Sequence, residues 1–230
     1  MQNPWLELKD KKPYILDSDK KIIDDFNKRA DESKKIRVNN ITTPFIGDFS
    51  MAKILLLQLN PGSEIPPGLE PTEDHEFLIY KSLKNDFLNN IQHKKMKYPF
   101  FWLNPEYRMT GGFKYWVRMF SSHIKNRGDY LKITNKVCCV QYFPYHSKKY
   151  GPINQIIKSQ EYNFYLVKDF IKKPGRLVIL MRAEKEWLKA VPELNRAGFL
   201  RLKSTHNPVL TKNNFKKDKD FERFVGLLNK

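Results

Sequence analysis

Unbroken apolar runs dominate the hydrophobic pattern of this chain, and such runs are typical of strands that are buried on both faces. The first run covers residues 53–59, shows no alternation of apolar and polar positions, and ends at Asn60-Pro61-Gly62. Similar runs cover residues 136–143, 176–181 and 199–202. We therefore predict four strands in a short parallel sheet, because antiparallel sheets more often alternate.

Apolar positions at helical spacing separate these strands. They predict a helix that bears Phe113, Trp116 and Phe120, and further helices over residues 22–33, 72–92, 161–171, 184–191 and 218–228. Residues 44–48, Pro-Phe-Ile-Gly-Asp, are predicted to form a turn that leads into the first strand. Strands that alternate with helices favour a three-layer α/β/α fold. At 230 residues one domain suffices, with residues 1–44 as an N-terminal helical extension.

The charge balance indicates an acidic partner. Lysine and arginine total 42 residues against 25 aspartates and glutamates, which gives a formal net charge of +17. A chain this basic favours binding to phosphate backbones, so DNA, duplex or single-stranded, is the first candidate partner. An aromatic content of 13% adds to this interpretation. The alternative is a lysine-rich surface that binds nothing anionic.

Other classes of protein are disfavoured. The first residues, Met-Gln-Asn-Pro-Trp-Leu-Glu, are followed by charges, so we expect neither a signal peptide nor an anchor. No apolar stretch is long enough to span a bilayer. Cys138 and Cys139 are neighbours on a predicted strand and point to opposite faces, which excludes a disulfide framework and a cysteine metal site. We expect a cytoplasmic protein that is a monomer, since the sequence carries no oligomerisation signal.

Polar residues stand at the carboxyl ends of the predicted strands. Asn60 follows the first strand, Gln141 ends the second, and Ser204-Thr205-His206-Asn207-Pro208 follows the last. In parallel sheets the ligand crevice lies beyond the carboxyl ends of the strands, so we expect these residues to lie around one site. Asn-Pro-Gly by itself is also a common structural turn.

These strand ends resemble those of the uracil-DNA glycosylase superfamily, over about residues 45–230. In that superfamily the first strand ends in a water-activating motif, which is Gly-x-Asn-Pro-Gly in the mismatch-specific and single-strand-selective branches. Residues 58–62, Gln-Leu-Asn-Pro-Gly, match this motif except at the first glycine. The resemblance implies that Asn60 positions the attacking water and that the reaction needs no metal and no other cofactor.

The resemblance leaves two alignments of the last loop. The family's loop, His-Pro-Ser-Pro-x-Asn-Pro, carries the catalytic histidine and wedges into the minor groove; Ser204, Asn207 and Pro208 match it in part. Aligning the terminal Asn-Pro puts Leu202 at the histidine position and makes His206 the residue inserted into DNA. A shifted alignment makes His206 the catalytic histidine.

The family flips its target base into a pocket, where the base is stacked on a ring and read along its edge. Gln141 stands where the family has an asparagine that reads this edge, and Gly62 replaces a bulky tyrosine that excludes groups on pyrimidine C5. The residues expected to bind the base are Gln58, Gly62, Gln141 and His146, with Phe100, Phe101 and Tyr142 as stacking rings. The residues expected to contact DNA are Pro61, Ser63, Lys148, Lys149, Lys203, Ser204, Thr205, Asn207 and Lys212.

The resemblance thus implies a monofunctional DNA glycosylase. It would hydrolyse the N-glycosidic bond of a flipped uracil or C5-modified pyrimidine and leave an abasic site, in base-excision repair or in defence against modified phage DNA. Asn60 and His206 are its expected catalytic residues, with His146 as another candidate for the histidine. Two alternatives stay open: a glycosylase-like protein that only binds nucleic acid, and a hydrolase of nucleotides or other small molecules.

Overall fold

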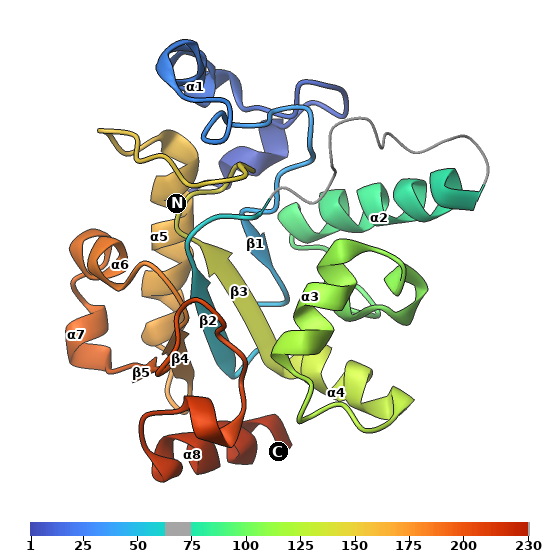
Figure 1. Cartoon of the computed structure of the whole chain (residues 1–230), viewed down its shortest axis with the longest axis vertical. Coiled ribbons are helices and arrows are strands. Elements are labelled where there is room, and N and C mark those ends of the chain that lie inside the picture. The colour runs from blue at the N-terminus through green and yellow to red at the C-terminus, as the bar shows by residue number, and fades with distance from the viewer. Residues whose placement is uncertain (63–74, 230) are drawn as a thin grey trace.

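The computed structural model describes residues 1–62 and 75–229. In this part of the chain a five-stranded sheet forms the centre, with helices on both of its faces (Figure 1). The order of the strands in the sheet is β1-β3-β2-β4-β5. Their bounds are β1 (Phe45–Ile46), β2 (Ile54–Gln58), β3 (Val137–Gln141), β4 (Leu177–Leu180) and β5 (Leu200–Arg201).

The sheet is mixed. Strands β2 to β5 are parallel, as the apolar runs predict, but β1 pairs antiparallel with β3, with Phe45 opposite Val140. The predictions of a turn over residues 44–48 and of a sheet with only four parallel strands are therefore wrong. A strand of two residues has no readable periodicity. Gly47 follows it at φ 105°, where an added Cβ would lie 2.8 Å from the carbonyl oxygen of Val137.

Successive strand residues alternate between two hydrophobic cores, one on each face of the sheet. In β2, Leu55 and Leu57 pack into the first core, and Ile54 and Leu56 into the second. The first core is covered by α1 (Asp17–Arg29), α5 (Lys158–Ile171), α6 (Glu184–Ala190) and α7 (Leu194–Ala197). The second is covered by α2 (His75–Ile91), α3 (Gly111–Met119), α4 (Arg127–Lys136) and α8 (Asp218–Asn229).

Several helices differ from the predicted ones: α5 begins at Lys158 rather than at residue 161, and α7 is absent from the predicted set. Helix α1 begins at Asp17 rather than at residue 22, because acidic residues in the first turn favour a helix start. The apolar spacing did not predict this start, since the first turn is polar. Helix α4 is absent from the predicted set, since Ile133 is the one large apolar residue that it buries. Asn126 and Asp129 form a capping box at its start, and this sequence signal would have found the helix.

The N-terminal extension packs on the first core and supports the loop that follows β3. Trp5 and Ile23 are fully buried there. The hydroxyl of Tyr145 donates a hydrogen bond of 2.8 Å to the carboxylate of Asp19, and burial raises the pKa of that carboxyl group. Residues 1–44 therefore hold the chain in place immediately before His146 and Ser147.

The short 3₁₀ helices of the described chain are η1 (Pro4–Glu7), η2 (Phe101–Leu103), η3 (Pro105–Tyr107) and η4 (Lys212–Asn214).

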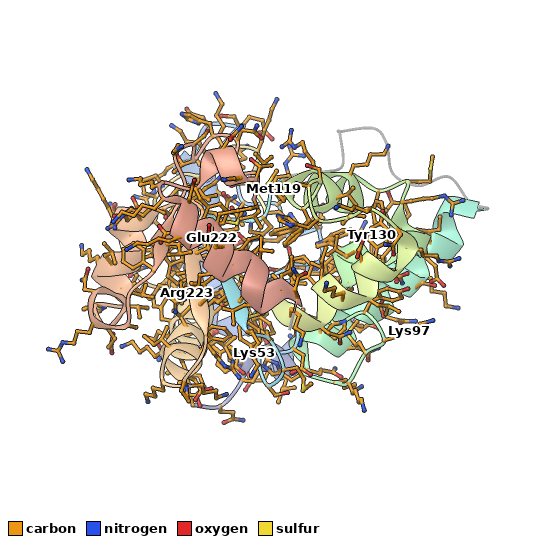
Figure 2. All side chains as sticks on the ribbon, turned by 90° about the horizontal axis from the view of Figure 1, so that it is seen from below. Lys53, Lys97, Met119, Tyr130, Glu222 and Arg223 are labelled. Carbon is orange, nitrogen blue, oxygen red and sulfur yellow. The ribbon has the colours of Figure 1, made fainter. Side chains whose placement is uncertain are left out.

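Figure 2 views the molecule from below, where α8 carries Glu222 and Arg223. Lys53, which immediately precedes β2, is labelled on this side, so this view faces the amino ends of the parallel strands. The ammonium group of Lys132 on α4 donates to the side chain of Asn229 on α8 at 2.7 Å. Among the described residues, no helix is both long and apolar enough to cross a membrane.

Candidate active site

A pocket of about 390 Å³ opens at the carboxyl ends of β2 and β3, beside the residues that follow β4. The register of the sheet places Gln58, at the end of β2, directly beside Gln141, at the end of β3. Asn60 lines the same pocket, as does Arg182 from the end of β4. The structure thus brings the polar ends of three neighbouring strands together.

A second hollow, of about 580 Å³, lies between α1 and residues 152–155. It is lined by charged and apolar side chains, but it holds none of the buried polar atoms that lack a hydrogen-bonding partner among the described residues. Two residues that line the pocket at the strand ends each carry one such atom, Gln141 Oε1 and Arg182 Nε. Because buried polar atoms are normally paired, this difference favours the strand-end pocket as the ligand site.

Asn60 is fixed at the mouth of the pocket by hydrogen bonds beyond the strand. The amide N–H of Phe143 donates to the carbonyl oxygen of Leu59 at 2.7 Å, so the ladder between β2 and β3 continues past its last paired residues. The side-chain amide nitrogen of Asn60 donates to Ser147 Oγ at 3.0 Å and to the carbonyl oxygen of Pro61 at 3.1 Å. In the described part of the chain Asn60 Oδ1 has no hydrogen-bonding partner, which leaves it available to accept from a water molecule.

His146 clamps the turn that carries Asn60. Its Nδ1 lies 2.6 Å from the carbonyl oxygen of Gly62, and its Nε2 lies 2.9 Å from that of Ile41. Burial lowers the pKa of this histidine, and the two carbonyl groups oppose that shift. His146 does line the pocket, but both ring nitrogens are engaged by backbone, so its geometry does not suit a group that donates to a departing base.

The two glutamines at the strand ends differ in their bonding. Gln58 donates from Nε2 to the hydroxyl of Tyr115 at 3.2 Å and lies 3.3 Å from the sulfur of Met181. Gln141 is 5% exposed, and its side-chain oxygen has no partner among the described residues. Of the two amides, Gln141 therefore has the free hydrogen-bonding capacity that reading a base edge requires.

The predicted stacking rings do not line the pocket. Phe100 and Phe101 are fully buried, and Phe100 packs edge-on against Trp116 with ring centroids 4.7 Å apart. Tyr142 packs against Phe164 and Trp187 in the first core. The structure therefore places these three rings in the hydrophobic cores and not in the pocket, contrary to the expectation.

Four other rings line the pocket instead: Trp102, Tyr115, Trp116 and Tyr150. Trp102 takes its place because Gly112 has no side chain; a Cβ there would lie 2.5 Å from the indole. The sequence places Trp102 in the same aromatic block as Phe100 and Phe101, and nothing in that block tells which ring faces the pocket.

Cationic side chains border the pocket. Lys148 and Lys149 line it and are exposed at its rim, on the loop held by Ser147 and His146. Arg182 lies deeper, and its Nη2 donates to the carbonyl oxygen of His206 at 3.1 Å. Sequence reasoning missed Arg182, although it follows a buried strand as directly as Asn60 and Gln141 do.

The loop over residues 203–208 borders this region but is built differently. Lys203, Thr205, His206 and Asn207 are exposed, and Ser204 is half-buried. Asn214 holds the loop, since it accepts from the amide N–H of Ser204 at 2.9 Å and donates to the carbonyl oxygens of Asn207 and Val209. The histidine ring of residue 206 does not line the pocket.

The remaining expected residues divide as follows. Pro61 is buried and Gly62 is exposed, both line the pocket, and a Cβ at Gly62 would meet no other described residue within 4 Å. Lys212 is exposed and lies 3.5 Å from Asp218 in an ion pair. Leu202, which takes the histidine position in one alignment, is 3% exposed and belongs to the second core. Ser63 lies outside the described residues.

No group of three or more histidine, cysteine, aspartate or glutamate side chains in the described ranges could hold a metal ion. No protein-family model matches the chain, and neither a curated protein nor a solved structure matches it. The geometry of the pocket and the resemblance of residues 58–62 to the water-activating motif are the features of this chain that bear on its function.

Proposed function

We propose that the protein is a monofunctional DNA glycosylase with a uracil-DNA glycosylase-like fold, which hydrolyses the N-glycosidic bond of a flipped pyrimidine. The observation that carries this proposal is that two side-chain amides, those of Asn60 and Gln141, line one pocket at the ends of adjacent strands. Ser147 orients Asn60, and among the described residues neither the side-chain oxygen of Asn60 nor the buried side-chain oxygen of Gln141, which lines the same pocket, has a partner. The first amide suits a water molecule, and the second suits the edge of a base.

The chemistry explains why these groups are needed. Cleavage of the bond between C1′ and the base nitrogen leaves positive charge on the sugar and the bonding electron pair on the base. The water held by Asn60 Oδ1 adds to C1′, loses a proton, and becomes the new hydroxyl group. The base takes up one proton, so the net reaction is the addition of one water across the bond. Fixed groups of this kind act because their geometry is set before the reaction.

The surroundings of the pocket fit a flipped nucleotide in DNA. A volume of about 390 Å³ falls in the range of small-ligand pockets, ~300–1,000 Å³, so a base with a substituent has room. No other described residue lies within 4 Å of a Cβ added at Gly62, which supports substrates that carry a group on C5. Lys148 and Lys149 at the rim are placed to meet phosphates on either side of the flipped nucleotide.

A catalytically inactive DNA-binding protein is the second candidate, and one observation favours it. Leu202 is buried in the core at one of the two positions that alignment offers for the histidine, and His146 is engaged by backbone carbonyls. A protein that kept the basic surface but lacked leaving-group stabilisation would bind DNA and release no base.

The test is base release by wild type and by Asn60→Ala. Single-turnover reactions use DNAs that contain uracil, hypoxanthine, a thymine mismatch or a C5-modified cytosine, followed by alkali to cut abasic sites. We expect Asn60→Ala to slow base release by about 100-fold or more, because the water loses its position. Asn85→Ala, at an exposed position on α2, is the matched control and should leave the rate unchanged. Salt-dependent binding without release from any of these DNAs would favour the inactive binding protein.

A further inference from the structure

The proposed reaction requires a group that stabilises the electron pair left on the departing base. The histidines considered for this task are poorly placed. Both nitrogens of His146 bond to carbonyl oxygens, and the ring of His206 is exposed and does not line the pocket. This inference rests on the proposed function and asks which side chain takes that task.

Arg182 lies where such a group is needed. It follows β4, and its amide N–H bonds to the carbonyl oxygen of Leu57 at 3.3 Å, which holds it beside the end of β2. Its side chain lines the pocket together with Asn60 and Gln141. Ala183 comes next and adopts φ 58°, a left-handed conformation that is uncommon for a residue with a side chain. Backbone strain of this kind is more frequent at functional sites.

The hydrogen bonds of Arg182 leave part of its guanidinium group unused. Nη2 donates to the carbonyl oxygen of His206, whereas Nε is buried and has no partner among the described residues. A guanidinium group carries five N–H donors, so one bond to backbone does not satisfy it. A buried donor without a partner is costly, so this side chain is incompletely satisfied in the described part of the protein.

The charge of Arg182 is not neutralised by a carboxylate in the described part of the chain. None of the ion pairs there involves Arg182, and neither aspartate nor glutamate is among the described residues that line the pocket. Glu184, two residues away, is bound by the guanidinium group of Arg201 through hydrogen bonds of 2.7 and 2.9 Å. Among the described residues, the pocket therefore holds a positive charge that no carboxylate neutralises.

We propose that Arg182 is a catalytic residue that binds the departing pyrimidine and stabilises its negative charge. As the bond from C1′ to N1 breaks, the electron pair moves onto N1 and the ring carbonyl oxygens, where N–H groups of the guanidinium donate. Arg182 keeps its own proton, the base later takes up the proton that the attacking water releases, and no oxidant or further reactant is involved.

The test compares two leaving groups in single-turnover base release. Wild type, Arg182→Gln and Arg182→Lys are each measured on DNA with uracil and on DNA with 5-fluorouracil, whose fluorine makes the departing anion more stable. If another pyrimidine is the substrate, its more acidic 5-halogenated analogue takes the second place. Lys185→Gln, at an exposed position on α6, removes the same charge outside the pocket.

We expect Arg182→Gln to slow release of uracil by about 100- to 1,000-fold, the usual cost of losing a donor to a developing anion. The loss should be at least tenfold smaller for 5-fluorouracil, because the better leaving group needs less help. Arg182→Lys should retain part of the rate with the same dependence on the base, and it serves alone if the glutamine variant does not fold. Lys185→Gln should match wild type.

Two results would overturn the proposal, and they are distinguishable. An active wild type whose Arg182 variants keep the wild-type rate, or lose the same factor on both bases, would contradict the role of Arg182 alone. A wild type that releases no base from any DNA would contradict the proposed function, and this inference with it.

Discussion

The turn at residues 60–62 and the loop at residues 203–208 both follow parallel strands, but only the turn has its polar side chain, that of Asn60, held by another side chain. The turn is braced by side chains: Ser147 bonds to Asn60, and His146 bonds to the carbonyl oxygen of Gly62. The loop is held by Asn214 through backbone groups, which leaves its own side chains mostly exposed. The first arrangement suits a group that must be fixed before a reaction, and the second suits contact with a partner.

Replacing His146, which holds the turn, and His206, which lies in the loop, should give the largest difference in stability between the two regions. His146→Ala removes a buried ring whose two nitrogens lie 2.6 and 2.9 Å from backbone carbonyl oxygens, so we expect the free energy of unfolding to fall by about 2–4 kcal/mol. His206→Ala removes an exposed ring, so we expect a change below about 0.5 kcal/mol. Urea unfolding followed by circular dichroism measures both values. Equal losses in the two variants would mean that the turn is no more rigid than the loop.

Ser147 sharpens the comparison within the turn. Ser147→Ala removes the acceptor that orients the Asn60 side chain, so we expect base release to slow by about three- to tenfold while DNA affinity is unchanged. Ser147→Thr keeps the hydroxyl group and should restore much of the rate.

A double variant shows whether Ser147 acts on the rate of base release through Asn60. If Ser147 acts through Asn60, adding Ser147→Ala to Asn60→Ala should cost little more, because the group that it orients is already gone. A full additional loss in the double variant would contradict a positioning role. Ser121→Ala, at an exposed position, should behave as wild type.

The rim lysines test the role of exposed charge. Lys148→Gln with Lys149→Gln should weaken DNA binding and reduce the slope of log affinity against log salt by about 0.9 for each phosphate that the protein no longer neutralises. Rates at saturating DNA should hardly change, because these side chains lie at the rim of the pocket. The matched pair is Lys185→Gln with Lys189→Gln on α6. The same decrease in slope for both pairs would indicate a diffuse basic surface rather than a binding face.

The buried strands and the residues at their ends were readable from the sequence, because long apolar runs have one simple structural meaning. Those runs predicted β2, β3 and β4, and with them the places of Asn60 and Gln141. Strand β1 was not readable, since two residues carry no pattern. Arg182 follows β4 as Asn60 follows β2, so its position was open to the same prediction, but the left-handed conformation of Ala183 beside it could not be predicted from an alanine.

The aromatic block shows the same limit at the level of single rings. Phe100, Phe101 and Trp102 are consecutive, and all three are suitable for stacking on a base. Only the fold decides among them: η2 turns the chain there, and Gly112 on α3 leaves space for the indole of Trp102. Side-chain direction in a short irregular segment depends on contacts far along the chain, and hydrophobicity does not encode it.

The pH dependence of stability is the smallest expected effect, because it is only a part of the contribution of His146 to the free energy of unfolding. Burial lowers the pKa of His146 below its ordinary 6.5, so the unfolded chain binds a proton between those two values that the folded protein does not. Stability should therefore be fully present above pH 6.5 and decrease as pH falls towards the lowered pKa. Thermal unfolding at several pH values from about 7.5 to 5.5 measures this decrease.

Two variants show whether His146 causes that decrease. The decrease should be shallower in His146→Ala than in wild type, and unchanged in His206→Ala, the exposed control. Burial also lowers the pKa of the half-buried His123, so part of the decrease in stability at low pH should persist in both variants. A slope that is equally steep in all three proteins would mean that His146 is protonated in the folded state, with both carbonyl groups accepting from a cationic ring.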